Sequence, residues 1–235
     1  MKGKVVFVTG GSSGYGKATA AEMVKNGATV IIAARNREAL ETAQKEIGCD
    51  AVICMDVTKY ADWQEAYKTI VEKYGRLDVL VNNAGAGVAI KSIVDQSQEE
   101  IDQSIALNLT SAIYGTQVFA PLMKEQRDGT IINVSSVCAK QAWPGFSIYG
   151  AAKTGMLGFS KGAYVDLRPY NVRVTCLIPA SASTGFEKSA NLQPSPHAMT
   201  VQDVADSIMY ICKLPQHAVV EELTVWGIDQ EVIPL

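Results

Sequence analysis

The chain has 235 residues, 48% of them hydrophobic and 19% charged, which suits one sizeable globular domain and excludes a chain that is disordered or fibrous throughout. Its 21 Lys and Arg against 24 Asp and Glu give a net charge of −3, and no apolar run is long enough to span a membrane, so we expect neither nucleic acid nor a membrane as a partner. Five cysteines without a Cys-x-x-Cys pair, together with two histidines, argue against a disulfide framework or a metal site and indicate a reducing, cytoplasmic setting.

Seven short apolar runs rich in β-branched residues recur along the chain, and segments with helical periodicity separate most of them. The predicted strands span 5–8, 29–32, 51–55, 77–81, 130–134, 172–178 and 223–226. The predicted helices span 18–25, 37–47, 63–74, 101–123, 151–167 and 201–212. Because strand and helix alternate and the strands are continuously apolar, we predict a single α/β domain over residues 1–235. It is a doubly wound, Rossmann-type domain with a mostly parallel seven-stranded sheet and helices on both faces.

A glycine-rich turn follows the first strand and leads into the first helix. It reads Thr9-Gly10-Gly11-Ser12-Ser13-Gly14-Tyr15-Gly16. Glycine lets the backbone approach a ligand closely, and a helix N-terminus offers free N–H groups and a positive dipole end, so a pyrophosphate is the natural ligand. The alternative is a tight turn that binds nothing. We expect a dinucleotide cofactor bound by Gly10, Ser12, Ser13, Gly14, Tyr15 and Gly16.

The end of the second strand bears on which dinucleotide binds. A carboxylate there would accept hydrogen bonds from the ribose of NAD, whereas the 2′-phosphate of NADP needs a cation. The segment that ends in Arg35-Asn36-Arg37 holds no acid and offers guanidinium groups suited to a phosphate. We therefore expect NADP(H) rather than NAD(H), with Arg35 at the phosphate. The alternative is that both arginines belong to a solvated helix start.

Tyr149 and Lys153 lie four residues apart at the start of a predicted helix, so both project from one face. An ammonium near a phenol favours the phenolate and lowers its pKa from about 10 toward neutrality, which would make Tyr149 a general acid or base. Ser136 follows the strand predicted over 130–134, at the edge where doubly wound sheets place their ligands. These three residues are therefore the candidate catalytic group.

With these motifs in order, the chain resembles the short-chain dehydrogenases/reductases, in the group that uses a Tyr-x-x-x-Lys pair. The matching residues are Thr9-Gly10-x-x-x-Gly14-x-Gly16, Asp56-Val57, Asn82-Asn83-Ala84-Gly85, Asn108, Ser136, Tyr149, Lys153 and Pro179. The resemblance covers nearly the whole chain. It implies an NADP(H)-dependent oxidoreductase, a carbonyl reductase that interconverts a ketone and a secondary alcohol.

The resemblance also implies a role for each catalytic residue. Tyr149 exchanges a proton with the substrate oxygen, and Ser136 donates a hydrogen bond to the same oxygen. Lys153 lowers the pKa of Tyr149 and binds the nicotinamide ribose. Asn108 holds a water molecule that passes protons from Lys153 to solvent. The hydride moves between the substrate and the cofactor.

Further cofactor contacts follow from the same resemblance. It implies that the adenine lies at Asp56 and Val57, the adenosine ribose along Asn83, Ala84 and Gly85, and the nicotinamide at Tyr149, Lys153, Pro179 and Thr184. Asn82 would instead tie neighbouring backbone together, and Asp56 has a second interpretation as the N-cap of a helix that starts near Tyr60. The chain departs from the family where Pro179-Ala180 replaces the usual Pro-Gly, which bears on Thr184.

Two segments are expected to form the substrate pocket, namely 137–148 and the aperiodic region 179–200. Candidate substrate contacts are Ser136, Cys138, Trp143, Tyr149 and Phe186, with Phe146 in the same loop as Trp143. If they line the pocket, the small-molecule substrate is a fairly bulky apolar ketone, and Cys138 has no catalytic task. The alternative is that the aromatic residues pack within loops or at an interface.

Two other function classes and an assembly are also weighed. An epimerase or dehydratase on the same fold would keep the Tyr and Lys pair with a tightly held cofactor, and a non-enzymatic dinucleotide sensor would need only the fold. The helix after Tyr149 carries many small residues, at Ala151, Ala152, Gly155, Gly158 and Gly162. In the family this helix and the one over 101–123 form subunit contacts, which implies a homodimer or homotetramer to which 223–226 contributes.

Overall fold

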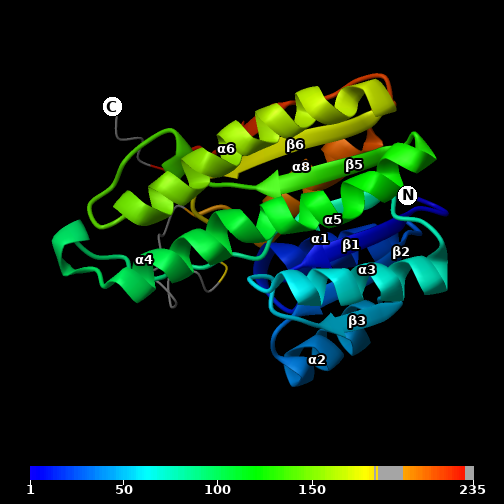
Figure 1. Cartoon of the computed structure of the whole chain (residues 1–235), viewed down its shortest axis with the longest axis horizontal. Coiled ribbons are helices and arrows are strands. Elements are labelled where there is room, and N and C mark those ends of the chain that lie inside the picture. Colours follow the sequence, from blue (N-terminus) through cyan, green and yellow to red (C-terminus); the bar gives the residue numbers. More distant parts are fainter. Residues whose placement is uncertain (183, 185–197, 231–235) are drawn as a thin grey trace.

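The computed structural model of the chain describes residues 1–182, 184 and 198–230. The strands are β1 (Val5–Thr9), β2 (Thr29–Ala34), β3 (Ala51–Cys54), β4 (Val79–Asn82), β5 (Gly129–Val134), β6 (Val172–Pro179) and β7 (Glu222–Val225). They form one sheet in the order β3-β2-β1-β4-β5-β6-β7, and every neighbouring pair is parallel (Figure 1). The predicted doubly wound sheet is confirmed.

The strand order reverses at β1, which pairs with β2 on one side and β4 on the other. Val6 stands opposite Val30 of β2 and Val79 of β4. The chain therefore builds one half of the sheet outward from β1 to β3, and then crosses back to build the other half from β4 to β7. Doubly wound sheets bind their ligands beyond the carboxyl ends of the strands at such a reversal.

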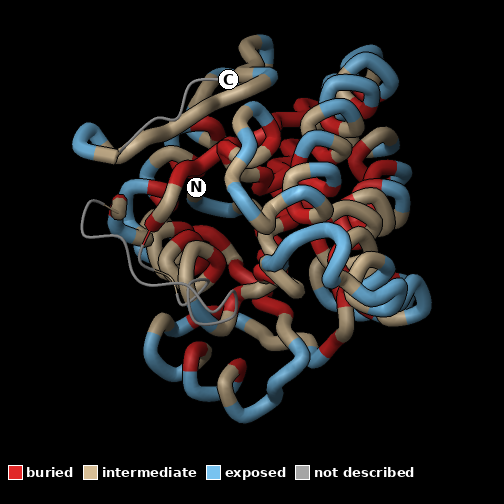
Figure 2. Tube along the Cα trace, turned by 90° about the vertical axis from the view of Figure 1, so that its left-hand side faces the viewer, coloured by how far each residue is buried: buried red, intermediate tan, exposed pale blue. Residues whose placement is uncertain are grey.

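Helices cover both faces of the sheet because the strands bury side chains on both. One face carries α1 (Gly14–Lys25), α2 (Arg37–Ile47) and α8 (Val201–Lys213), and the other carries α3 (Tyr60–Tyr74), α5 (Ser111–Gln126) and α6 (Ser147–Leu167). Successive residues of β1 alternate between the two cores, with Val6 and Val8 in one and Val5 and Phe7 in the other. Figure 2 shows the buried strands in the middle and exposed positions on the outer sides of the helices.

The helix predicted over 101–123 is helical throughout, but it starts at Gln98, ends at Gln126 and contains a π turn that the prediction did not include. A short helix, α4 (Gln98–Ile105), is followed by a turn of π-helix over Ala106–Thr110 and then by α5. A π turn inserts one residue into the helical repeat, and such insertions are frequent at functional sites. Here the inserted turn carries Asn108.

Polar side chains tie the sheet to the helices beneath the expected site. Asn82 Nδ2 donates to Asn133 Oδ1 at 2.8 Å and to the Ala112 carbonyl at 3.4 Å. Asn133 Nδ2 in turn donates to Ser160 Oγ of α6 at 2.9 Å. All three side chains are buried. This network holds β4, β5, α5 and α6 together, as expected for Asn82.

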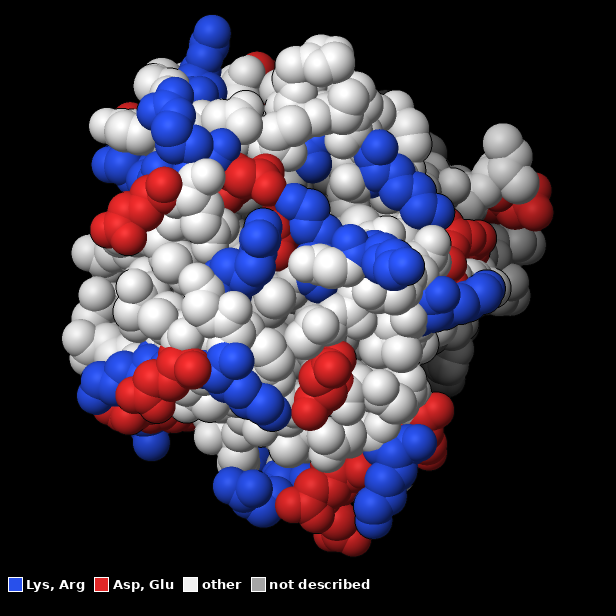
Figure 3. Space-filling model, turned by 90° about the vertical axis from the view of Figure 1, so that its right-hand side faces the viewer, with Lys and Arg blue, Asp and Glu red and all other residues white. Residues whose placement is uncertain are grey.

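The opposite edge of the sheet, where the strands begin, is held by ion pairs. Asp78 accepts hydrogen bonds from Arg76, from Lys4 and from the Val5 N–H. Burial opposes the charge of Asp78, but these donors outweigh burial and hold the pKa of the carboxyl below its usual value. Acidic and basic side chains are interspersed over this end of the molecule (Figure 3). Among the described residues, no helix is long and apolar enough to cross a bilayer.

Candidate active site

Ser136, Tyr149 and Lys153 meet where β5 ends and α6 begins. Ser136 follows β5 in extended backbone and opens a 3-10 turn over Val137–Ala139. Tyr149 and Lys153 lie on the buried face of the first turns of α6. The Ser136 hydroxyl lies close enough to the Tyr149 phenol to counteract part of the rise in its pKa, and the Nζ of Lys153 lies 5.6 Å from the centre of the Tyr149 ring. The structure therefore brings the three candidate catalytic residues together.

The side chain of Lys153 is held by the sheet and not by the phenol. Its Nζ donates to the carbonyl of Val134 at 3.0 Å, and Ser135 Oγ donates to the carbonyl of Lys153 at 2.9 Å. Burial disfavours the ammonium and lowers the pKa of Lys153 to about 8. The lysine is therefore still mainly charged at pH 7, and it loses its charge just above that pH.

The pKa of Tyr149 is raised, so the expected lowering by Lys153 is wrong for this arrangement. Burial of the phenol is the main cause, and nearby Cys138 and Tyr15 add to it, while the hydrogen bond from Ser136 acts in the opposite direction. Lys153 directs its Nζ at the Val134 carbonyl. Tyr149 consequently carries its proton at neutral pH, which is the form that a general acid requires.

Asn108 lies in the π turn and is fully buried. Its Oδ1 accepts from the Ala86 N–H at 3.1 Å, and its Nδ2 donates to the carbonyls of Ala86 at 3.0 Å and Ser104 at 3.1 Å. A Cβ placed on Gly85 would lie 2.9 Å from Asn108 Oδ1 and 3.4 Å from Lys153 Nζ. Asn108, Gly85 and Lys153 are thus neighbours, and the proposed water relay through Asn108 stays a prediction.

The glycine-rich turn has the geometry that a phosphate needs. Gly10 and Gly14 have φ of +67° and +52°, and a Cβ on Gly16 would lie 2.3 Å from the Gly10 carbonyl oxygen. Ser13 is the N-cap of α1, but its side chain makes no capping hydrogen bond, and the first turn holds no acidic residue. The helix N-terminus is therefore not blocked by a side chain of its own cap or by a nearby carboxylate of that turn, and it fits the pyrophosphate of a dinucleotide.

The segment after β4 braces this turn. The N–H groups of Asn83 and Ala84 donate to Thr9 Oγ1 at 3.0 and 3.1 Å, and Asn83 Nδ2 donates to the Thr9 carbonyl at 2.8 Å. The side-chain amide of Asn83 therefore binds the backbone of the turn, whereas the sequence predicted that it would contact the ribose. Ala84 and Gly85 continue from there toward Asn108.

At the ends of β2 and β3 the structure places the expected adenosine contacts. Arg35 is exposed, and among the described residues it has no ion pair. Burial opposes the charge of Asp56, but hydrogen bonds from the N–H and Oγ1 of Thr58 and the positive charge of Arg35 hold the pKa of its carboxyl below its usual value. The N-cap interpretation of Asp56 is wrong, because the N-cap of α3 is Lys59.

Val57, Pro179 and Thr184 are three further expected cofactor contacts. The side chain of Val57 is buried and its carbonyl accepts from Trp63 Nε1 at 2.9 Å. Pro179 is the last residue of β6, and the carbonyl of the next residue, Ala180, accepts a hydrogen bond from Tyr15 Oη at 3.4 Å. Thr184 lies beside the glycine turn, since a Cβ on Gly14 would be 3.4 Å from Thr184 Cβ.

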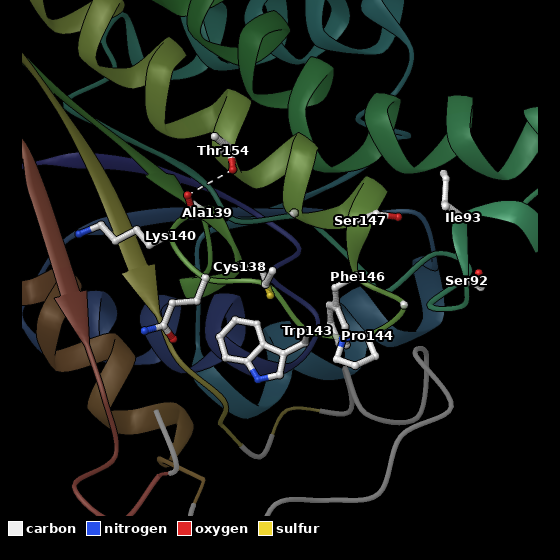
Figure 4. Close-up of a pocket in the computed structure, with 14 residues that line it drawn as sticks. Ser92, Ile93, Cys138, Ala139, Lys140, Trp143, Pro144, Phe146, Ser147 and Thr154 are labelled. Atoms are coloured by element: carbon white, nitrogen blue, oxygen red, sulfur yellow. Dashed lines mark hydrogen bonds between the residues drawn. The ribbon is translucent and has the colours of Figure 1, made fainter. Parts of the chain in front are cut away.

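A cavity of about 740 Å³ lies beside the start of α6, and Cys138 and Trp143 line it, whereas Ser136 and Tyr149 are not among its lining residues (Figure 4). Phe146 also lines it, and its ring meets the Tyr149 ring edge-on with centroids 5.9 Å apart. The remaining lining residues are Ser92, Ile93, Ala139, Lys140, Gln141, Ala142, Pro144, Gly145, Ser147, Gly150 and Thr154. Phe186 and most of the expected substrate region 179–200 lie outside the described residues.

Sequence reasoning missed Ser92 and Ile93 as cavity residues. They belong to the connection between β4 and α4, which has no strand or helix periodicity apart from a 3-10 turn over Ile93–Asp95. The signal for them is an apolar pair, Ile93-Val94, within the otherwise polar run 91–98, and both residues are exposed. Within the described part of the chain, no cluster of three or more His, Cys, Asp or Glu residues could hold a metal ion.

Comparison with known proteins shows which family the chain is similar to. The family model for short chain dehydrogenases matches residues 4–195. An uncharacterized oxidoreductase of Staphylococcus aureus is 31% identical over 94% of this chain and 96% of its own length. A metagenomic short-chain oxidoreductase solved in complex with NADP is 30% identical, covers 95% of this chain and 96% of its own, and superposes with a TM-score of 0.84. The closed form of a serine dehydrogenase complexed with NADP+ is 26% identical over 98% of both chains, with a TM-score of 0.90.

Proposed function

The chain belongs to the short-chain dehydrogenase family of oxidoreductases, and from this premise we propose that it is an NADP(H)-dependent reductase that interconverts a ketone and a secondary alcohol. The observation that carries the proposal is that Ser136, Tyr149 and Lys153 come together where β5 ends and α6 begins, with the Nζ of Lys153 5.6 Å from the centre of the Tyr149 ring. A proton donor and a hydrogen-bond donor there can act on one carbonyl oxygen.

Each residue of the group has a task in this reaction. Tyr149, protonated at neutral pH, donates its proton to the substrate oxygen, while Ser136 donates a hydrogen bond that stabilises the charge developing there. Lys153, whose Nζ is held by the Val134 carbonyl, binds the nicotinamide ribose when the cofactor is present. When bound, the nicotinamide cofactor supplies or accepts the hydride. The residues that would hold it are the glycine turn of 10–16, Arg35, Asp56, 83–85, Pro179 and Thr184.

Two observations favour NADP(H) over NAD(H). Arg35 is exposed at the end of β2 with its guanidinium outside any ion pair of the described residues, and no acid stands at that strand end. Solved relatives 25–30% identical to the chain were determined with NADP, with NADP+ or with 5-hydroxy-NADP. Asp56 lies near Arg35 at the end of the neighbouring strand, and Thr58 hydrogen-bonds to one of its two carboxylate oxygens.

The cavity supports a substrate that is fairly bulky and apolar. Trp143, Phe146 and Ile93 line it together with alanine and proline. The ammonium of Lys140, on the same wall, is paired with Glu222 and donates to Thr224 Oγ1. Its charge is therefore neutralised by Glu222 of β7, so the cavity does not require an anionic substrate.

We further propose that the protein is a cytoplasmic homo-oligomer. All five cysteines are free, as a reducing compartment would keep them. On α6, Gly158 and Gly162 face open space and Val165 is 61% exposed, so this face can approach a second copy closely. Light scattering tests the assembly, and a monomer would contradict this part of the proposal alone.

The function is tested by following NADPH oxidation with a panel of ketones, keto esters, quinones and sugars. We expect one class to be reduced with a much higher kcat/KM than the others, and the Tyr149→Phe variant to lose turnover by at least a hundredfold while it binds NADPH as tightly as the wild type. Turnover retained in Tyr149→Phe would contradict the mechanism. Conversion of a substrate without net NADPH consumption would instead indicate an epimerase or dehydratase, and NADPH binding without any turnover a sensor.

A further inference from the structure

The loop that follows β5 carries a buried polar atom without a partner among the described residues. Gln141 lines the cavity beside the start of α6, and its Oε1 is buried and accepts no hydrogen bond from any of these residues. Buried polar groups of folded proteins are almost always hydrogen-bonded, and an unmet acceptor destabilises the state that contains it. Gln141 Oε1 therefore needs a donor, which a molecule bound in the cavity can supply.

The main chain before this amide is fixed in place. The Gln141 N–H donates to the Val137 carbonyl at 3.0 Å and extends the 3-10 turn. Lys140 forms an ion pair with Glu222 and donates to Thr224 Oγ1 at 3.0 Å, and Figure 4 shows its side chain running away from the cavity toward β7. The last torsion of a glutamine side chain has broad minima, so rotation about it can turn Oε1 to the cavity.

The hydroxyl groups on the cavity wall need no further partner. Thr154 Oγ1 donates to the Ala139 carbonyl at 3.2 Å, the contact drawn as a dashed line in Figure 4. Ser92 and Ser147 are exposed, so water can satisfy them. Gln141 is thus the position at which this wall can distinguish a polar group of a ligand from an apolar one.

The cavity wall also contacts the catalytic group. The N–H of Cys138 donates to Ser136 Oγ at 3.2 Å, and the Phe146 ring meets the Tyr149 ring with centroids 5.9 Å apart. A ketone whose carbonyl oxygen is held by Ser136 and Tyr149 can therefore place its larger substituent in this cavity, within reach of Gln141.

We propose that Gln141 is a specificity-determining residue and that the substrate is a ketone whose larger substituent carries a neutral hydrogen-bond donor, either a hydroxyl or an amide N–H. The inference rests on the proposed reductase function and names a class of ketone for it. The donor binds Gln141 Oε1, and the apolar remainder packs against Trp143 and Phe146. An ammonium is disfavoured as the donor, because no acidic residue lines the cavity and the charge would be left unpaired.

Matched pairs of ketones test the proposal by NADPH oxidation. The first pair, para-(hydroxymethyl)acetophenone and para-ethylacetophenone, compares a hydroxyl with a methyl group. The second, para-acetylbenzamide and methyl para-acetylbenzoate, compares an amide N–H with a group that cannot donate, and the meta isomers of both pairs are included. We expect the donor-bearing member of at least one pair to react with a kcat/KM about tenfold to a hundredfold higher, and the two pairs distinguish a hydroxyl from an N–H.

Variants show whether this preference comes from Gln141. Gln141→Leu should reduce the ratio of kcat/KM values to within about twofold, mainly because the donor-bearing ketone reacts more slowly. Gln202→Leu is the matched control and should keep the wild-type ratio, because Gln202 is exposed on α8 and bonds to Asp206. A wild-type ratio near one in every pair, or a ratio that Gln141→Leu retains, would overturn the proposal.

Urea unfolding gives a measurement that does not depend on turnover. Leucine removes the unmet acceptor, so the urea midpoint of Gln141→Leu should equal or exceed that of the wild type. A lower midpoint in both Gln141→Leu and Gln141→Met would show that the fold or an enclosed water molecule already supplies the donor, and it would overturn the inference.

Failure of the proposed reductase function is recognised separately, as no NADPH oxidation with any ketone. Thermal shifts with para-(hydroxymethyl)acetophenone and para-ethylacetophenone then decide the role of Gln141. A larger shift with the hydroxymethyl compound that Gln141→Leu loses would support the inference, and equal shifts in the wild type would overturn it.

Discussion

Replacing Lys153 with Met tests whether burial controls the charge of the active-site lysine. The side chain is 3% exposed, and its pKa falls from the ordinary 10.5 to about 8. Because the folded pKa is the lower one, the unfolded chain binds the proton more tightly between pH 8 and 10.5, and the free energy of unfolding rises with pH in that window. Methionine has similar length and no charge to titrate.

The size of the effect follows from the shift. One pKa unit corresponds to about 1.4 kcal/mol, so between pH 7 and pH 10 the wild type should gain about 2 to 3 kcal/mol of stability relative to Lys153→Met. The variant also loses the hydrogen bond from Nζ to the Val134 carbonyl. This loss lowers its stability about equally at pH 7 and at pH 10, so it does not contribute to the change between the two pH values.

Urea unfolding of both proteins at pH 7, 8, 9 and 10, at one protein concentration, measures the difference. All other lysines and tyrosines titrate in both chains, which isolates the contribution of Lys153. A difference in unfolding free energy that stays constant from pH 7 to pH 10 would show that Lys153 titrates normally, and it would refute the assignment of its low pKa to burial. We expect Lys153→Met to have lost turnover at every pH.

Two further outcomes follow from the cofactor half of the molecule. Gly16→Ala should lower the unfolding free energy by about 1 to 3 kcal/mol, because its Cβ would lie 2.3 Å from the Gly10 carbonyl oxygen. Ser13→Ala in the same turn should change the unfolding free energy by less than about 0.5 kcal/mol, because the Ser13 side chain makes no capping hydrogen bond. Equal effects in urea unfolding would contradict this account of the turn. Arg35→Ser should raise KM for NADPH about tenfold or more and leave KM for NADH within about twofold. A parallel change in both KM values would show that Arg35 does not bind the 2′-phosphate.

Local sequence patterns were sufficient for the sheet and for the catalytic group. Continuous apolar runs predict strands that are buried on both faces, and the observed strands differ from the predicted ones by a few residues at their ends. Ser136 follows a strand and Tyr149 lies on the next helix, so a parallel sheet must bring them to the same edge. Their proximity follows from the topology of the sheet, and the alternation of strands and helices in the sequence predicts that topology.

Tertiary packing decided what the patterns missed. The π turn at Asn108 inserts one residue into an apolar helical repeat, which periodicity reads as continuous. The direction of the pKa shift of Tyr149 depends on how deeply the phenol is buried and on where Lys153 points, and neither is encoded in a four-residue spacing. The partner of Asn83 is the backbone of Thr9, 74 residues earlier, which no local signal indicates.

That bond between Asn83 and Thr9 also sets an order of events during folding. The glycine turn lies within the first 16 residues, yet its brace comes from the segment that follows β4, and β1 must first pair with β4 for the two to meet. Such long-range parallel pairing forms late and slowly. We therefore expect a refolding chain to acquire affinity for its dinucleotide when the centre of the sheet closes, so that cofactor binding would report that closure.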